Sequence, residues 1–283
     1  MPPFIYPIAS SSKGNCVYIG NGEDSGILVD IGVGPRVLIN SLNAAGINPQ
    51  SIKALFITHE HSDHISGIEL FLKHFDIPVY GSYGTLNAVL SNRRLPPTAA
   101  LKEINHSSVS IETFSVSSFK TSHDAADSRG YIIEQKGNGV ASERTAVCTD
   151  LGLVTHAVQS ALEGCKTVYL ESNYCPEMLA ANREYSPWLK NRIRSETGHL
   201  SNEECRDLAH FLVPRGTKNI ILAHLSENNN TPEIALNETL GSFVNNGAEI
   251  GNDINISVAR VRATAPTVRG TGILTHTTSG KNF

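Results

Sequence analysis

The sequence has 283 residues, of which 40% are hydrophobic and 18% are charged, so it has the composition of a folded globular chain. Lys and Arg number 23 against 27 Asp and Glu, a formal net charge of −4, which excludes a protein that holds nucleic acid by a basic surface alone. A metal-assisted mode stays open, because divalent cations would add positive charge inside an active cleft.

Short apolar runs alternate with amphipathic stretches along most of the chain. Runs rich in β-branched residues predict buried strands at residues 25–31, 54–59, 145–150, 167–172 and 219–224. Apolar residues at three-to-four spacing predict helices at residues 65–75, 156–163, 202–212 and 232–244. Strand-like runs without helices between them indicate antiparallel pairing within residues 109–135. Together these elements predict an α/β fold built in layers.

The connections indicate how the chain is divided. Residues 136–143 are expected to form a turn or hairpin tip, and no interdomain linker or tandem repeat is present. We therefore expect residues 1–262 to form a single domain. Residues 263–283 are rich in Thr and Gly with little apolar periodicity, which predicts a C-terminal tail.

The cysteines and the apolar runs bear on cellular location. The odd number of scattered cysteines, with no pair at two-residue spacing, is typical of a reducing compartment; they are Cys16, Cys148, Cys165, Cys175 and Cys205. No run approaches the ~18 consecutive apolar residues of a membrane span, and the first residues lack the charged and apolar regions of a signal peptide. We expect a cytoplasmic protein without a membrane anchor.

The strongest chemical signal directly follows one of the predicted strands. The sequence Thr-His-Glu-His-Ser-Asp-His places His59, His61, Asp63 and His64 within six residues. A chain that leaves a strand can point the rings of His59 and His61 the same way, and Ser62 can cap a following helix. Imidazole and carboxylate ligands suit zinc, iron or manganese. The alternative, a polar loop that gathers three of the 11 histidines by chance, is improbable.

Three further ligand candidates close other predicted strands. His123 ends the run SFKTSH, Asp150 ends TAVCTD and His224 ends NIILAH. Functional side chains collect where strands give way to loops. A lone histidine at a strand end is more often a surface or capping residue than a ligand. Three such residues in a chain that also contains HxHxDH favour metal binding.

The motifs around these ligands resemble the metallo-β-lactamase superfamily of binuclear hydrolases. Within it they are similar to the bacterial WalJ/YycJ group, metal-dependent DNA exonucleases of the 5′ to 3′ type. The similarity extends from Ser10 to about Asn230 and includes SSKGNC at residues 11–16, TSHDAAD at 121–127, TDLG at 149–152, LESN at 170–173, GHLSN at 198–202 and HLS at 224–226. The chain departs from many relatives at Tyr174 and Cys175, where His-Asp is expected.

The resemblance implies a fold, a cofactor and a set of ligands. The fold is an αββα sandwich, two mixed sheets flanked by helices, with the site at one edge. The ligands of one ion would be His59, His61 and His123, those of the second Asp63, His64 and His224, and Asp150 would bridge the two. These ligands accept Zn²⁺, Mn²⁺ or Fe²⁺. Asp30, at the end of a predicted strand, is expected to orient a ligand imidazole, or else to cap a turn.

Such a site would hydrolyse phosphodiesters. Two metal ions can bring the pKa of a bridging water near neutrality and hold phosphate oxygens, so a metal-bridged hydroxide is the expected nucleophile, with Asp63 and Asp150 in catalytic positions. His199 is the candidate general acid, because the leaving oxygen needs a proton and a histidine can supply one near neutral pH. His199 could instead be an exposed residue before a helix capped by Ser201 or Asn202.

Polar and basic segments are candidates for substrate contacts. The expected phosphate-binding residues are Ser226, Asn229, Asn230, Arg192 and Arg194. Arg192 and Arg194 belong to the clearest basic stretch of the chain, in which Trp188 is available for stacking. An ordinary polar turn and a solvated helix face are the respective alternatives.

Several functions share this ligand pattern. We expect a 5′ to 3′ DNA exonuclease; the alternatives are an RNA-processing endonuclease, a cyclic phosphodiesterase and a thioester or lactone hydrolase. A secreted β-lactamase is disfavoured, because such enzymes carry an export signal and many use cysteine where this chain has Asp150. A metal-stabilised scaffold is also disfavoured. It would need a closed coordination sphere, whereas a site with a bridging Asp150 and a nearby His199 is expected to be open. The sequence leaves open the native metal, the oligomeric state and the choice between DNA and RNA.

Overall fold

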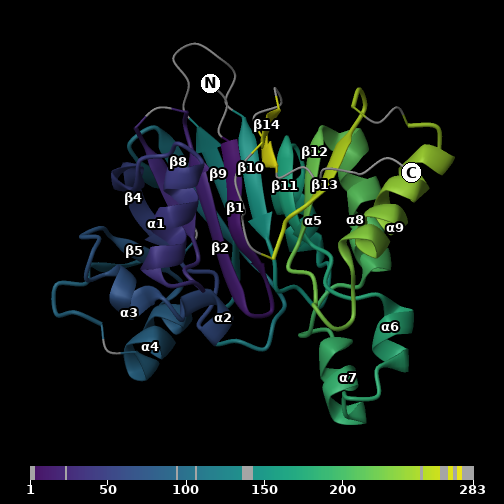
Figure 1. Cartoon of the computed structure of the whole chain (residues 1–283), viewed down its shortest axis with the longest axis horizontal. Helices are drawn as coiled ribbons and strands as arrows, with labels where there is room; N and C mark the ends of the chain where they lie inside the picture. Colours follow the sequence, from purple (N-terminus) through teal and green to yellow (C-terminus); the bar gives the residue numbers. More distant parts are fainter. Residues whose placement is uncertain are drawn as a thin grey trace.

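The computed structural model describes residues 4–261 apart from residues 23, 94, 106, 136–142 and 249–250, together with the backbone of residues 267–269 and 273–275. Two β-sheets lie face to face, with helices on their outer faces (Figure 1). Most of the turn predicted at residues 136–143, and the remainder of the predicted tail, lie outside the described residues.

The first sheet is mixed. Its strands, in spatial order, are β14 (Thr267–Arg269), β15 (Ile273–Thr275), β1 (Phe4–Ser11), β2 (Gly14–Gly20), β3 (Gly26–Val29), β4 (Ile52–Phe56), β5 (Val79–Gly81) and β6 (Leu101–Glu103). β1, β2 and β3 pair antiparallel, whereas β3 to β6 run parallel to one another. The ends of β3 and β4 therefore point to the same edge of the sheet.

The second sheet is also mixed. Its strands, in spatial order, are β13 (Asn255–Val258), β12 (Asn219–Ala223), β11 (Thr167–Glu171), β10 (Arg144–Cys148), β9 (Arg129–Gln135), β8 (Phe114–Lys120) and β7 (Val109–Ile111). β10 to β13 are parallel, and β7 to β10 are antiparallel. The carboxyl ends of β10, β11 and β12 consequently meet at one edge.

Helices connect and cover the strands. They are α1 (Pro35–Ala44), α2 (Ser62–Ile65), α3 (Ile68–Phe71), α4 (Tyr83–Asn92), α5 (His156–Leu162), α6 (Pro176–Ala181), α7 (Pro187–Ile193), α8 (Asn202–Leu212) and α9 (Pro232–Asn245), with 3₁₀ turns at Pro49–Ser51 and Val213–Arg215. Side chains that accept a backbone N–H cap several of them, and Ser201 and Glu204 form a capping box at α8. None of the described helices has the length and apolar character needed to cross a bilayer.

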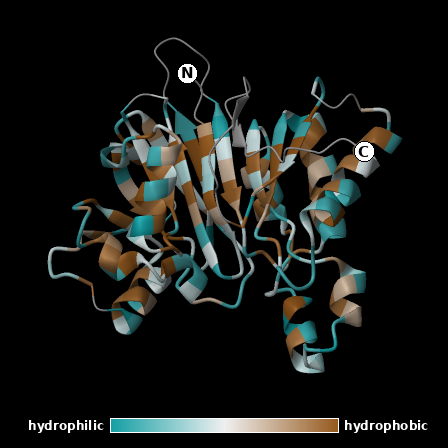
Figure 2. Ribbon diagram, viewed as in Figure 1, coloured by the Kyte–Doolittle hydropathy of each residue, from teal (hydrophilic) through white to brown (hydrophobic). Residues whose placement is uncertain are grey.

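Apolar side chains hold the layers together. Between the sheets, Phe56 of β4 meets Tyr131 of β9 with ring centroids 5.3 Å apart, and Tyr169 of β11 belongs to the same buried cluster. Leu38 of α1 packs on the outer face of the first sheet, and Leu208 of α8 on that of the second. Figure 2 shows the hydrophobic residues along the strands. Each such buried side chain contributes about 1.5–3 kcal/mol, and the layering confirms the expected αββα sandwich.

One predicted helix is wrong in extent. In place of a single helix at residues 65–75, α2 ends at Ile65 and α3 begins at Ile68. Gly67 lies in the break, where a Cβ atom would lie 1.9 Å from the carbonyl oxygen of Val33, and its N–H donates to the carbonyl oxygen of Ile31 at 2.9 Å. Tertiary contact with the chain that leaves β3 thus overrides the local helical periodicity.

The Thr/Gly-rich segment predicted to be a C-terminal tail contains two short strands. Its described residues form β14 and β15, which pair antiparallel with each other. Ile273 of β15 pairs with Ile5 of β1 in parallel. The edge of β1 offers unpaired backbone groups, and threonine is favoured in strands, so this segment can extend the first sheet without a hydrophobic pattern of its own.

The loop after β3 packs closely at Gly32 against the segment that carries HxHxDH, and substitution of this glycine tests the contact. A Cβ atom at Gly32 would lie 1.7 Å from the carbonyl oxygen of Asp63, whereas at Gly34 it would meet no atom within 4 Å. We expect Gly32→Ala to lower the free energy of unfolding by about 1–3 kcal/mol or more. Gly34→Ala should change it by less than about 0.5 kcal/mol. Denaturant unfolding measures both, and equal stabilities would contradict the close packing.

Candidate metal centre

The HxHxDH segment begins where β4 ends. Thr58 is held by Asp30, whose two carboxylate oxygens accept hydrogen bonds of 2.8 Å each from the Thr58 backbone N–H and hydroxyl. α2 then starts with His61 at the N-cap position, not the predicted Ser62. The sharp entry into α2 turns His59 and His64 inward, and both imidazoles are fully buried.

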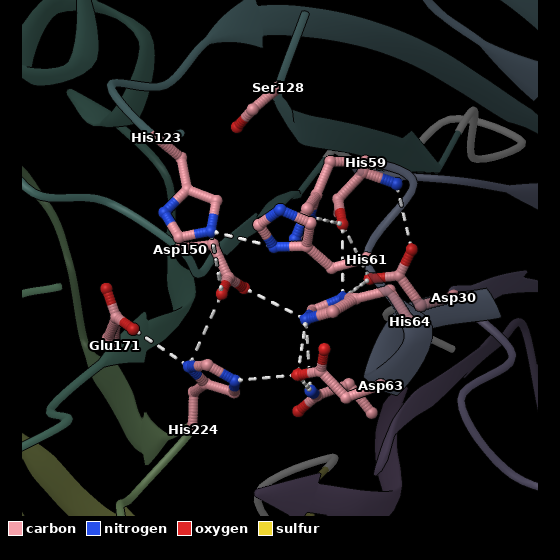
Figure 3. A network of polar contacts seen from close by, with 12 residues as sticks. Asp30, His59, His61, Asp63, His64, His123, Ser128, Asp150, Glu171 and His224 are labelled. Atoms are coloured by element: carbon pink, nitrogen blue, oxygen red, sulfur yellow. Dashed lines mark hydrogen bonds and ion pairs between the residues drawn. The ribbon is translucent and has the colours of Figure 1, made fainter. Parts of the chain in front are cut away.

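The three imidazoles of His59, His61 and His123 face one another (Figure 3). Their ring centroids are 4.5–5.0 Å apart, and Nε2 of His123 lies 3.3 Å from Nδ1 of His61. His123 arrives from the loop after β8, in the other sheet. The structure therefore brings together the three histidines that the resemblance assigns to one ion.

The second predicted group also assembles. Oδ2 of Asp63 lies 3.3 Å from Nε2 of His64 and 3.5 Å from Nε2 of His224. His224 follows β12, and Asp63 and His64 belong to α2, so this group again joins the two sheets. One donor atom from each residue lies within 4.8 Å of the others.

Asp150 lies between the two groups. Its Oδ2 is 3.2 Å from Nε2 of His64, and its Oδ1 is 3.8 Å from Nε2 of His123 and 3.6 Å from Nδ1 of His224. The side chain is buried, which would raise the pKa of Asp150, but the imidazoles of His224, His64 and His123 outweigh burial and hold the pKa below its usual value. A carboxylate in this position reaches both groups.

Three residues of the centre have left-handed backbones. Asp30, Asp150 and His224 have φ values of 62°, 57° and 55°, and each follows the end of a strand. The other non-glycine residue with positive φ in the described part of the chain, Glu112, lies in the turn between β7 and β8. Left-handed backbone costs about 1–2 kcal/mol for most residues. These strained corners turn the side chains out of the strands and into the site.

Hydrogen bonds fix which ring nitrogen faces the centre. Nδ1 of His64 donates to Oδ2 of Asp30 at 2.7 Å, and Nδ1 of His123 donates to the carbonyl oxygen of Gly198 at 3.0 Å. Each bond leaves Nε2 turned toward the cluster, as a metal ligand requires. Asp30 thus accepts a hydrogen bond from the ring of a ligand candidate, and its role in orienting that ring stays a prediction.

The donor set fits a divalent cation. Nε2 of His59 is buried and has no hydrogen-bond partner among the described residues. Burial, together with His64, His123 and His61 nearby, holds the pKa of His59 well below its usual value, so this imidazole is neutral and able to coordinate. The carboxylates of Asp63 and Asp150 lie close to the His59 imidazole and can neutralise the charge of a cation. Imidazole and carboxylate donors in this arrangement suit a divalent metal of the first transition series.

Glu171 is a residue of the site that the sequence did not reveal. It is fully buried at the end of β11, and its Oε1 lies 2.8 Å from Nδ1 of His199 and 2.8 Å from Nδ1 of His224. Oε2 accepts the backbone N–H groups of Leu151 and Leu200. Burial would raise the pKa of Glu171, but His199 and His224 outweigh it and hold the pKa well below its usual value. The motif LESN already contained the residue, but a glutamate at the end of an apolar strand was its only separate signal.

His199 lies at the rim of the centre. Because the Glu171 carboxylate accepts, Nδ1 of His199 must donate, which leaves Nε2 free. About a fifth of the side chain, 22%, is exposed to solvent, unlike the ligand candidates His59, His64 and His224. The ring of His199 is 5.1 Å from that of His123, so it borders the cluster without being enclosed by it.

Two further polar residues touch the centre. The Asn15 amide donates to Oδ2 of Asp63 at 3.2 Å and to the carbonyl oxygen of Ser11 at 3.0 Å. Oδ1 of Asp124 lies 3.5 Å from Nε2 of His123 and 3.9 Å from Nε2 of His61. Both residues belong to motifs of the resemblance, but no isolated feature of the sequence distinguishes them from ordinary loop residues.

The prediction that Asn229 and Asn230 contact substrate phosphates needs correction. Both are buried, as is Ser226. The amide of Asn230 donates to the carbonyl oxygens of Ser172 and Asn173, and that of Asn229 donates to the hydroxyl of Ser226. These groups stabilise the loop after His224 from within, so a substrate phosphate does not meet them at the surface.

The remaining predicted contacts are exposed. Arg192 of α7 donates from Nε to Oδ2 of Asp124 at 2.6 Å, and Arg194 lies at the end of the same helix. Tyr174 and Cys175 are buried instead. The carbonyl oxygen of Tyr174 accepts the backbone N–H of Asn202, and the backbone N–H of Cys175 donates to the carbonyl oxygen of Asn229. The two residues that depart from the related motifs thus pack inside the protein.

Comparisons with known proteins agree with this geometry. A model of the metallo-β-lactamase superfamily matches residues 12–145. Exodeoxyribonuclease YycJ from Bacillus anthracis is 34% identical over 232 residues, which cover 81% of this chain and 84% of the relative. Exodeoxyribonuclease WalJ from Streptococcus pneumoniae is 28% identical over 252 residues, or 88% and 91% of the two chains.

A solved structure supports the fold. Yeast PDE1 superimposes with a TM-score of 0.68 at 16% identity and covers 92% of this chain and 98% of its own. The shared layers, the HxHxDH segment at the edge of the sandwich and the similarity to YycJ over most of both chains lead to one assignment. The chain belongs to the metallo-β-lactamase superfamily of hydrolases.

Proposed function

We propose that the chain is a metal-dependent phosphodiesterase that acts as a 5′ to 3′ DNA exonuclease. The observation that carries the proposal is the position of Asp150, whose two oxygens face two separate ligand groups. The names of YycJ and WalJ, which align along most of this chain, support DNA as the substrate. The five cysteines are free and buried, which is compatible with a cytoplasmic enzyme.

Two cations are proposed to bind side by side. His59, His61 and His123 would hold one, Asp63, His64 and His224 the other, and Asp150 would contact both. Zn²⁺ and Mn²⁺ match these nitrogen and oxygen donors. When bound, such ions make hydroxide available from water at neutral pH and neutralise a phosphate.

The protein's own residues would position and protonate the substrate. Asp63 and Asp150 would be carboxylate ligands of the ions, and Glu171 fixes the ring of His199 by accepting a hydrogen bond from its Nδ1. A proton on Nε2 of His199 can then pass to the leaving oxygen of the phosphodiester. Arg192 and Arg194 stand on the exposed helix next to His199, where guanidinium groups can bind the phosphates of the chain end.

The first prediction concerns the metal ions. Wild-type protein reconstituted with Mn²⁺ or Zn²⁺ should retain close to two ions per chain, as an Asp150-bridged pair requires. Asp150→Ala should lower this ratio and abolish hydrolysis, because both groups lose a shared ligand. His156→Ala, which removes an exposed histidine of α5, serves as the control and should keep both ions. Elemental analysis measures the number of metal ions per chain. An unchanged number in Asp150→Ala would show that Asp150 is not a shared ligand of the two ions.

The second prediction separates His199 from the ligands. His199→Ala should retain both ions and slow turnover by roughly 10²–10⁴-fold, the usual contribution of a general acid. The loss should shrink on an aryl phosphodiester whose leaving group needs no proton. Equal losses on good and poor leaving groups would show that His199 positions the substrate and donates no proton.

The third prediction concerns the direction in which DNA is degraded. Linear DNA labelled at its 5′ end should release the label early as mononucleotides or very short products, while 3′-labelled DNA shortens progressively. Covalently closed circular DNA, which has no end, should persist, and RNA of the same sequence should be degraded more slowly. Internal cleavage of the circle, or preferred trimming of a tRNA-like 3′ trailer, would identify an endonuclease instead.

A further inference from the structure

α7 is a short helix that stands out from the body of the protein beside α6 (Figure 1). None of its residues is buried. Trp188, in its first turn, has 71% of its surface exposed, the largest exposed fraction among the large hydrophobic side chains of the described residues. A single exposed hydrophobic side chain is ordinary on a protein surface, so a role for Trp188 depends on the residues that surround it and on its position relative to the metal centre.

The helix is nevertheless tied to the metal centre. Trp188 and Arg192 are four residues apart and so share a face of α7. Arg192 reaches Asp124, whose other oxygen lies 3.5 Å from Nε2 of His123. At the end of the helix, the carbonyl oxygen of Ile193 accepts the backbone N–H of His199 at 2.9 Å. The face that carries Trp188 therefore continues toward the candidate proton donor and the ligands.

The charge of this segment is one-sided. Residues 187–194 contain Lys190, Arg192 and Arg194 and no acidic residue, although the chain as a whole has a net charge of −4. Cations on the same short helix as an exposed aromatic ring match a polyanion that also presents flat bases.

We propose that Trp188 stacks on a base of the single-stranded end of the DNA, while the cations of α7 contact the adjoining phosphates. The inference rests on the proposed nuclease function and narrows its substrate to an unpaired strand at the entrance. A base inside a duplex stacks on its neighbours and cannot lie on the ring. Trp188 would thus select frayed or single-stranded ends before they reach the metals.

The chain has one tryptophan, so its fluorescence reports on this contact alone. The probe is a short oligothymidylate with phosphorothioate linkages, which slow hydrolysis, added to the metal-loaded wild-type enzyme. Stacking predicts saturable quenching of the emission and protection of Trp188 from iodide. An abasic oligomer of the same length and charge should produce neither effect. Equal quenching by the abasic oligomer would overturn the proposal.

Substitution supplies an independent test with a matched control. Stacking of one base is worth about 1–3 kcal/mol, a factor of about 5–160 in binding, so Trp188→Ala should raise KM for single-stranded DNA by that factor. Trp188→Phe should keep KM close to the wild-type value, because phenylalanine also offers a ring for stacking. Tyr83 is similarly exposed, at 64%, but its helix α4 carries no charged residue. Tyr83→Ala should leave KM unchanged.

The two possible failures are distinguishable. If wild-type enzyme degrades DNA and Trp188→Ala keeps the wild-type KM, the stacking proposal is wrong and the nuclease function stands. If wild-type enzyme with its metals degrades neither DNA nor RNA, the proposed function fails first. Because Trp188 is on the surface, its replacement should leave the melting temperature unchanged, which thermal unfolding checks.

Discussion

Charge compensation at the buried edge of the sandwich is the constraint on which the site depends. An unpaired buried carboxylate or imidazolium costs several kcal/mol, and Asp30, Asp150 and Glu171 are all buried here. Each is placed against an imidazole, and the hydrogen bonds that stabilise Asp30 and Glu171 also fix the tautomers of the rings that they contact. Folding and ligand orientation are therefore settled by one set of contacts. A metal ion would take over part of this compensation from the protons.

Topology makes this concentration of charge possible. The carboxyl ends of the parallel strands of both sheets point to one edge, so residues far apart in sequence arrive together. His59 follows β4 in the first sheet, and Asp150 and His224 follow β10 and β12 in the second. The apolar interface between the sheets holds the two edges at a fixed separation. Because each ligand group combines residues from both sheets, a small movement of one sheet against the other would pull the ligands within each group apart.

The sequence allowed the layers and the ligand candidates to be predicted because both have strong local signals. Buried strands are short apolar runs, and HxHxDH gathers several donors within a few residues. Other features depend on tertiary contact. The break at Gly67 reflects the nearby carbonyl oxygen of Val33. Asn230 is as polar as a substrate-binding residue but bonds inward. Glu171 becomes distinctive only when two imidazoles share its Oε1.

The left-handed corners at Asp30, Asp150 and His224 have a consequence for how such a site is maintained. A chain selected for folding alone would favour glycine at these corners, since glycine adopts the left-handed conformation with less strain than any residue that has a Cβ atom. Here a residue of the proposed metal centre occupies each one. Random substitution followed by selection for thermal stability alone should therefore erode these three positions early, while the sandwich around them persists as an inert scaffold.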